Sequence, residues 1–161
     1  MSAFLDSCQD ARRETIAPGT EMLTEGERSE KLYVLLEGRV AVFRGNMEVA
    51  EVSQRGAVLG EMSALLDCPH TASVRTVTEA ECFVIDDAPA FLKSHPQAAF
   101  ALARMLAERL NTATGYLADV KRQYESHGSH LNMVGDVLET LIHQQEDDFL
   151  LGSDRAPDPH P

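Results

Sequence analysis

Between residues 16 and 86, short apolar segments alternate with turns that contain glycine. The clearest of these turns is Gly45-Asn46, a pair typical of two-residue β-hairpins. The sequence predicts strands on both sides of this turn and between the other turns, over residues 32–36, 39–44, 47–52, 73–78 and 81–86. Many short strands joined by regular turns are typical of a jelly roll or a β-barrel, so we expect a mainly β domain with added helices.

A second feature is the run Gly60–Leu66, which is followed after a short gap by Pro69–Val74. A glycine lets the backbone approach a ligand closely, and the short helix predicted after it begins with N–H groups that have no acceptor inside the helix. These donors and the helix dipole favour an anion, so we expect residues 60–64 to bind a phosphate. Glu61 would repel that phosphate unless it accepts a hydrogen bond from a neutral donor such as a sugar hydroxyl.

The run Gly60–Val74 resembles the phosphate-binding cassette of the cyclic nucleotide-binding domain family. Together with Gly26, the segment Leu32-Tyr33-Val34 and Gly38, the resemblance extends over residues 15–110. It implies the β-roll of that family, a double-stranded jelly roll, followed by a long helix, with cAMP or cGMP as the ligand and no cofactor. The ligand-binding residues that we predict are Gly60, Glu61, Met62, Ser63, His70, Thr71, Ala72 and Thr114.

The chain departs from the family at His70, where the family usually has arginine, whereas Glu61 matches the glutamate that holds the ribose hydroxyl. Histidine has a reference pKa of about 6.5 and one N–H per ring nitrogen at most, while arginine offers a permanently charged fork. We expect the change either to weaken binding about tenfold to hundredfold or to make another anion the ligand. If His70 contacts the phosphate, binding should strengthen as the pH falls through its pKa. The hydroxyls of Thr71 and Ser73 can donate to phosphate. Thr71 is equally interpretable as an ordinary strand residue, and for Ser73 the strand interpretation is favoured.

A long helix is predicted after Pro89, because apolar residues recur at intervals of three and four. The residues of this seam are Ala103, Leu106, Leu110, Ala113, Leu117, Val120 and Tyr124. We interpret the seam as a homodimer interface, and the alternative is a helix that packs only on its own roll. Thr114 lies where regulators of the resembled family present base-contacting side chains, although an exposed helix surface explains it too. Gly115 costs about 1 kcal/mol relative to Ala in a helix interior and suggests a close helix contact or a hinge.

The sequence predicts three segments. Residues 1–110 form the β-roll with flanking helices, of which the first contains Phe4, Leu5 and Cys8. Residues 111–143 form a helical dimerisation extension, and its second helix carries Leu131, Val134, Leu138, Leu141 and Ile142. Residues 144–161 are acidic and then rich in proline, and we expect this tail to be disordered.

The formal net charge of −12 disfavours nucleic acid as a partner, because phosphate backbones are bound by clustered Lys and Arg. The best-known relatives of the resembled domain carry a C-terminal helix-turn-helix, but the acidic segment after the long helix offers no basic recognition helix. No apolar run or leader-like N-terminus indicates a membrane, so we expect a cytoplasmic protein. Cys8, Cys68 and Cys82 lack a metal-like spacing and are expected to be reduced, mostly structural thiols.

The sequence contains no nucleophile motif, phosphate loop or paired-carboxylate pattern, so we expect no enzyme activity. His127, His130 and His143 lack partners for a metal site and are expected on the surface. The leading hypothesis is a dimeric sensor in which the ligand repositions the long helix and a surface for an unidentified protein partner. One alternative is a degenerate domain that serves dimerisation and protein interaction without nucleotide. The other is a metal-dependent β-roll enzyme.

Overall fold

The structure, a computed structural model, describes residues 2–124 and 132–142 of the 161-residue chain. The chain forms two compact units, Met1–Ala103 and Arg104–Pro161. The predicted segment boundaries at residues 110 and 143 stay predictions. His127, His130, His143 and the predicted disordered tail lie outside the described residues. Within the described ranges, none of the helices combines the length and the apolar character that a membrane span requires.

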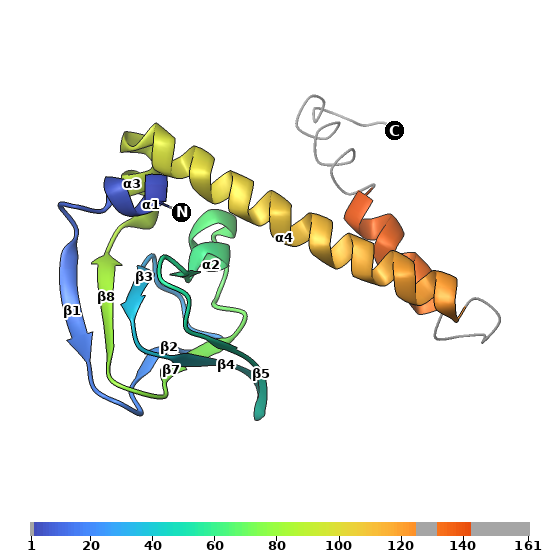
Figure 1. Cartoon of the computed structure of the whole chain (residues 1–161), viewed down its shortest axis with the longest axis horizontal. Helices are drawn as coiled ribbons and strands as arrows, with labels where there is room; N and C mark the ends of the chain where they lie inside the picture. Colours follow the sequence, from blue (N-terminus) through green and yellow to red (C-terminus); the bar gives the residue numbers. More distant parts are fainter. Residues whose placement is uncertain (1, 125–131, 143–161) are drawn as a thin grey trace, which may run out of the picture. The chain divides into compact units, whose positions relative to one another are not determined.

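The first unit contains two four-stranded antiparallel sheets (Figure 1). One sheet has the strand order β1-β8-β3-β6, and the other has the order β2-β7-β4-β5. The strands are β1 (Arg12–Ile16), β2 (Glu21–Leu23), β3 (Leu32–Glu37), β4 (Val40–Arg44), β5 (Met47–Val52), β6 (Val58–Leu59), β7 (Ser73–Thr76) and β8 (Ala80–Ile85). Because strands distant in the chain are neighbours in both sheets, the fold is the predicted β-roll and that prediction is confirmed.

The core of the roll lies between the two sheets and receives side chains from both. The first five residues of β3 are buried, as expected for a strand paired on both sides. Ten buried residues form the core cluster, namely Ile16, Leu23, Tyr33, Leu35, Val40, Leu59, Val74, Ala80, Cys82 and Val84. The predicted hairpin at Gly45-Asn46 is also confirmed, because β4 pairs with β5 and Arg44 lies opposite Met47.

The strand β1 lies almost wholly outside the predicted strands. Four of its five residues are exposed, so the alternation of apolar and polar residues that marks a half-buried strand is absent. At the sheet edge, Arg12 forms an ion pair with Asp86 at 2.7 Å, and Arg13 forms one with Glu81 at 2.9 Å. Charged side chains on an edge strand discourage pairing with other chains. The sequence pattern therefore misses β1 because its pairing depends on β8.

Four helices accompany the sheets, namely α1 (Ser2–Ser7), α2 (Glu61–Leu66), α3 (Ala88–Ser94) and α4 (Pro96–Gln123). Phe4 of α1 is fully buried, and its ring centroid lies 6.3 Å from that of Phe91 in α3. Cys8, which follows α1, is also fully buried. The short leading helix is therefore present, its Phe4 packs against α3, and Cys8 lies just beyond its end.

The second unit contains the later part of α4 and a helix over residues 132–142. A Cβ atom at Gly135 would lie 3.5 Å from Lys121 Nζ, so the two helices are in contact at this point. Of the predicted seam, Leu106, Leu110, Leu117 and Val120 are half-buried. A Cβ atom at Gly115 would meet no atom within 4 Å among the described residues, so the close helix contact suggested by this glycine stays a prediction.

Candidate functional site

The cassette begins at Gly60, the residue before α2. Gly60 has a left-handed backbone with φ 97°. Pairing of β6 with β3 brings it beside the start of β3, where a Cβ atom at this position would lie 2.7 Å from the Lys31 carbonyl oxygen. Residues with a side chain rarely adopt this conformation, and the space for a side chain is filled by backbone. Glycine is therefore required here, and it directs the chain into α2.

The helix α2 presents side chains with different environments. Glu61 in its first turn is only 6% exposed, whereas Met62 is 46% exposed. Ser63 is buried, and its hydroxyl donates to the carbonyl oxygen of Cys68 at 2.5 Å. The Ser63 side chain therefore stabilises the turn that ends the helix, and the predicted contact with a ligand would use its backbone.

His70 is buried and held by the loop between β2 and β3. Its Nε2 lies 2.7 Å from the hydroxyl oxygen of Ser29. The backbone N–H of His70 donates to the carbonyl of Glu27 at 2.8 Å, and its own carbonyl accepts from the Gly26 N–H at 2.9 Å. Burial lowers the pKa of His70 below its ordinary value of 6.5, against a smaller opposing effect of the Glu27 charge. The imidazole is therefore neutral at pH 7, unlike the family's arginine.

Thr71 and Ala72 lead from His70 into β7, and both are half-buried. The carbonyl oxygen of Thr71 accepts a hydrogen bond from Arg44 Nε at 3.0 Å. Sequence reasoning did not select Arg44 as a site residue. The available signal was its place just before the Gly45-Asn46 turn, in alternation with the apolar residues of β4. Its proximity to the cassette depends on the pairing of β4 with β7.

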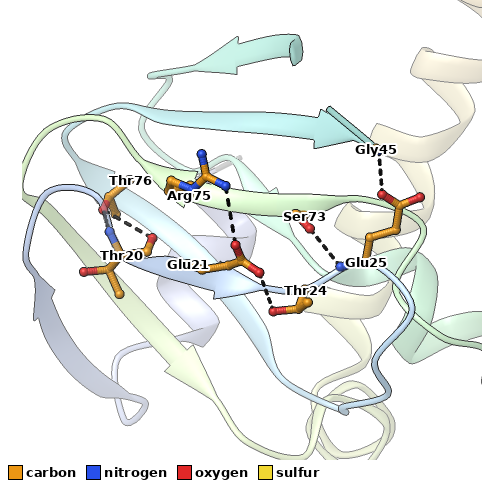
Figure 2. A network of polar contacts seen from close by, with 8 residues as sticks. All are labelled: Thr20, Glu21, Thr24, Glu25, Gly45, Ser73, Arg75 and Thr76. Atoms are coloured by element: carbon orange, nitrogen blue, oxygen red, sulfur yellow. Dashed lines mark hydrogen bonds and ion pairs between the residues drawn. The ribbon is translucent and has the colours of Figure 1, made fainter. Parts of the chain in front are cut away.

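A polar network fixes the hairpin tip and the loop after β2 to the cassette strand (Figure 2). A carboxylate oxygen of Glu25 accepts from the Gly45 N–H at 2.8 Å, and the Glu25 N–H donates to the hydroxyl of Ser73 at 2.9 Å. The Ser73 hydroxyl thus contacts the loop after β2. At the other end of β7, the Thr76 hydroxyl accepts from the Thr20 N–H at 2.8 Å. The strand that follows the cassette is therefore held by side chains along its length.

Other predicted site residues and thiols lie elsewhere in the fold. Thr114 is half-buried on α4 and belongs to the second unit, so its ligand contact stays a prediction. Burial raises the pKa of the thiols of Cys8 and Cys82 to about 11, as expected for structural cysteines. Within residues 2–124 and 132–142, no group of three or more His, Cys, Asp and Glu side chains is placed to hold a metal ion.

The neutral state of buried His70 predicts a pH-dependent stability. The pKa of His70 is lower in the folded protein than in the unfolded chain, so the unfolded chain binds more protons in mild acid. The contribution of His70 to the free energy of unfolding is present above about pH 6.5 and is lost as the pH falls through the folded pKa. Urea denaturation between about pH 7.5 and pH 5 measures this loss. His70→Gln, which keeps a polar group near Ser29 but does not titrate, should give a flatter profile, and equal slopes would contradict the expectation.

Comparison with known proteins assigns the chain to a family. The sequence profile described as the cyclic nucleotide-binding domain matches residues 13–94, about half of the chain and including the whole cassette. The chain belongs to the cyclic nucleotide-binding domain family. Domains of this family are regulatory and usually non-catalytic.

Individual relatives of this cyclic nucleotide-binding domain are regulators and kinases. A CRP-like cAMP-activated global transcriptional regulator of Mycobacterium tuberculosis is 30% identical over 108 residues, which cover 63% of this chain and 48% of that protein. A cGMP-dependent protein kinase of Caenorhabditis briggsae is 34% identical over 68 residues, which cover 42% of this chain and 9% of the kinase. The chain therefore spans less than half the length of both curated relatives.

The solved structure of the Thermus thermophilus catabolite activator protein shares the fold. It superposes with a TM-score of 0.59 and 20% sequence identity, and the superposition covers 92% of this chain and 84% of that chain. At this identity the likeness concerns the fold. It supports the β-roll with a long helix that the described residues form.

Proposed function

We propose that this cyclic nucleotide-binding domain is a non-enzymatic sensor that binds cAMP or cGMP at the cassette. Family membership supports the ligand class, since one relative is a cAMP-activated regulator and another is a cGMP-dependent kinase. In the proposal, the backbone around Gly60, Met62 and Ser63 and the hydroxyl of Thr71 contact the cyclic phosphate. Ala72 borders this contact, and Thr114 contacts the base.

The observation that carries the proposal is the placement of Glu61. A carboxylate in the first turn of α2 is buried beside a glycine that has no room for a side chain. Glu61 matches the position at which the family has the glutamate that holds the ribose hydroxyl, and a carboxylate oxygen accepts a hydrogen bond from such a hydroxyl. Glu61 therefore supports recognition of a sugar phosphate over recognition of a simple inorganic anion.

The proposed signal passes through α4. A ligand shifts a conformational equilibrium only if it binds one arrangement better than another, so the cassette must favour one position of the long helix. Half-buried apolar residues along α4 support pairing with a second copy of the chain, and we propose a cytoplasmic homodimer that presents a surface to a protein partner.

A second candidate function is supported by His70. Because the imidazole is buried, neutral and close to Ser29, the permanent charge that the family usually places here is missing. The domain would then be a degenerate member that serves dimerisation and protein interaction. This candidate predicts that neither cAMP nor cGMP changes the melting temperature, while light scattering still detects dimers.

Calorimetric titration with cAMP and cGMP, at about pH 5.5 and at pH 8, tests the sensor hypothesis. We expect saturable binding that is stronger in acid, because the phosphate favours the protonated imidazole and the pKa of free His70 lies below 6.5. His70→Arg should bind about tenfold to hundredfold more tightly and should lose this pH dependence. Unchanged affinity in that variant would reject His70 as the phosphate contact. A folded protein that gives no heat at either pH would favour the degenerate domain.

A further inference from the structure

Arg44 ends β4 directly beside the cassette. Its Nε donates to the carbonyl oxygen of Thr71 at 3.0 Å, across 27 positions of sequence. The next residue, Gly45, is held by a carboxylate oxygen of Glu25 at 2.8 Å, and the Glu25 backbone donates to Ser73 (Figure 2). Two adjacent residues at the end of β4 are therefore tied to the segment that contains the cassette, which restricts where the guanidinium can lie.

Arg44 is exposed at the end of β4, one residue beyond the register that pairs this strand with β7. Val40 pairs with Thr76 and belongs to the core cluster, and Val42 pairs with Val74 and packs against that cluster. Alternate residues of a strand share a face, so Arg44 continues the face of Val40 and Val42. The side chain of Phe43 lies on the opposite face, where the guanidinium of Arg75 stacks 4.7 Å from its ring centroid.

Arg44 shares with Arg55 the lack of an ion-pair partner among the described residues, whereas five other arginines of the roll have one. Ion pairs join Arg12 to Asp86, Arg13 to Glu81, Arg28 to Asp67, Arg39 to Glu51 and Arg75 to Glu21. In the described part of the chain, no carboxylate lies within ion-pair distance of Arg44, and only its Nε has a hydrogen-bond acceptor. The two terminal nitrogens, Nη1 and Nη2, form a planar pair of donors that matches two oxygens of a phosphate.

The charges around the cassette increase the need for such a cation. Glu25, Glu27 and Glu61 all lie on segments that form or contact the cassette, and His70 is neutral at pH 7. Arg28 on the same loop is already paired with Asp67 at 3.3 Å, so backbone N–H groups would have to offset the other carboxylates when an anion binds. The guanidinium of Arg44 is hydrogen-bonded to the carbonyl of Thr71, the residue after His70. It therefore supplies a permanent positive charge close to the cassette.

We infer that Arg44 is a phosphate-binding residue of this domain and supplies, from β4, the cationic contact that position 70 lacks. The inference rests on the proposed function and adds a residue to its site. The ligand it fits is a phosphate diester that carries one negative charge, as in a cyclic nucleotide, with two oxygens facing Nη1 and Nη2.

Arg44→Gln tests the inference by removing the charge while retaining a polar side chain. We expect the affinity for cAMP or cGMP to fall about tenfold to hundredfold, and the salt dependence of binding to weaken. Adenosine, which lacks the phosphate, should bind the variant and the wild type equally. Arg39→Gln is the matched control, because it changes the net charge equally on an arginine already paired with Glu51 at 3.3 Å. It should leave the affinity unchanged.

A purely structural role of the bond to Thr71 would give a different result. It would lower the affinity for adenosine as well as for cyclic nucleotides, and it would lower the melting temperature of Arg44→Gln. Arg44→Lys should give an intermediate affinity for cyclic nucleotides, since lysine keeps the charge but not the planar pair of donors. Equal losses for adenosine and cAMP would overturn the inference.

Titration of the same proteins with inorganic phosphate separates this inference from the proposed function. Cyclic nucleotide binding that Arg44→Gln leaves unchanged would overturn the role of Arg44 while the sensor hypothesis stands. Phosphate binding that depends on Arg44, without binding of cAMP or cGMP, would support the role of Arg44 and overturn the cyclic nucleotide sensor. No binding of cAMP, cGMP or phosphate to the wild-type protein would overturn both.

Discussion

Replacing Gly38 with alanine is expected to destabilise the β-roll by about 3 kcal/mol. Gly38 follows β3 with φ 101°, in the left-handed region that alanine adopts only with strain. An added Cβ atom would collide with the carbonyl oxygen of Glu79 and would lie 2.8 Å from Cα of Ala80. Both neighbours are backbone atoms at the start of β8, and Ala80 is buried in the core cluster, so neither can move cheaply.

Urea denaturation followed by circular dichroism measures this effect. Gly19→Ala is the matched control, because Gly19 also has a positive φ, 76°, but an added Cβ atom would meet nothing within 4 Å. Backbone strain alone should lower the free energy of unfolding of the control by about 1 to 2 kcal/mol. If the two variants lost equal free energy of unfolding, the collision with Glu79 and Ala80 would not be the dominant cost.

Replacing Gly60 with alanine is expected to destabilise the roll by about 2 to 3 kcal/mol and to lower cyclic nucleotide affinity at least about tenfold. The added Cβ atom would lie 2.7 Å from the Lys31 carbonyl oxygen and 3.3 Å from Cδ1 of Leu23. To relieve this contact the backbone must shift at the start of α2. Glu61 is the next residue and would move with it, so the ribose contact proposed for Glu61 should be lost.

The measurement combines urea denaturation with calorimetric titration of cAMP and cGMP. Gly19→Ala again controls for backbone strain, and because Gly19 lies in the turn between β1 and β2 it should not change the affinity. A Gly60→Ala protein that remained as stable as this control and bound nucleotide normally would contradict the close approach of Gly60 to Lys31. A loss of stability without a loss of affinity would show that the ligand does not bind at the cassette.

The strands could be predicted where their signal is local. The alternation over residues 39–44, the Gly45-Asn46 turn and the apolar segment before Gly38 depend on neighbours within a few positions, and β3, β4 and β5 form there. β1 could not be predicted in this way, because most of its residues are exposed and polar. They form a strand by backbone pairing with β8, and two arginines of β1 form ion pairs with Glu81 and Asp86. The cassette was recognisable because its residues are consecutive.

The environment of His70 could not be predicted from the residues next to it in the sequence. The identity of residue 70 indicated a weak, titratable substitute for arginine, but its pKa depends on burial and on Ser29 and Glu27. Those two residues lie on the loop after β2, some 40 positions earlier in the chain. Only the docking of this loop on the cassette determines that the imidazole is neutral.

By itself, the sequence determined the β-roll, its central hairpin and the consecutive residues of the cassette, because turn residues and side-chain alternation act over a few positions. The tertiary structure decided which distant groups meet at the cassette. Arg44 approaches Thr71, and the Lys31 carbonyl excludes a side chain at Gly60, because strand register and loop docking bring together residues that are 27 and more positions apart. Such contacts leave no local pattern, since each depends on the pairing of strands that are not consecutive in the chain.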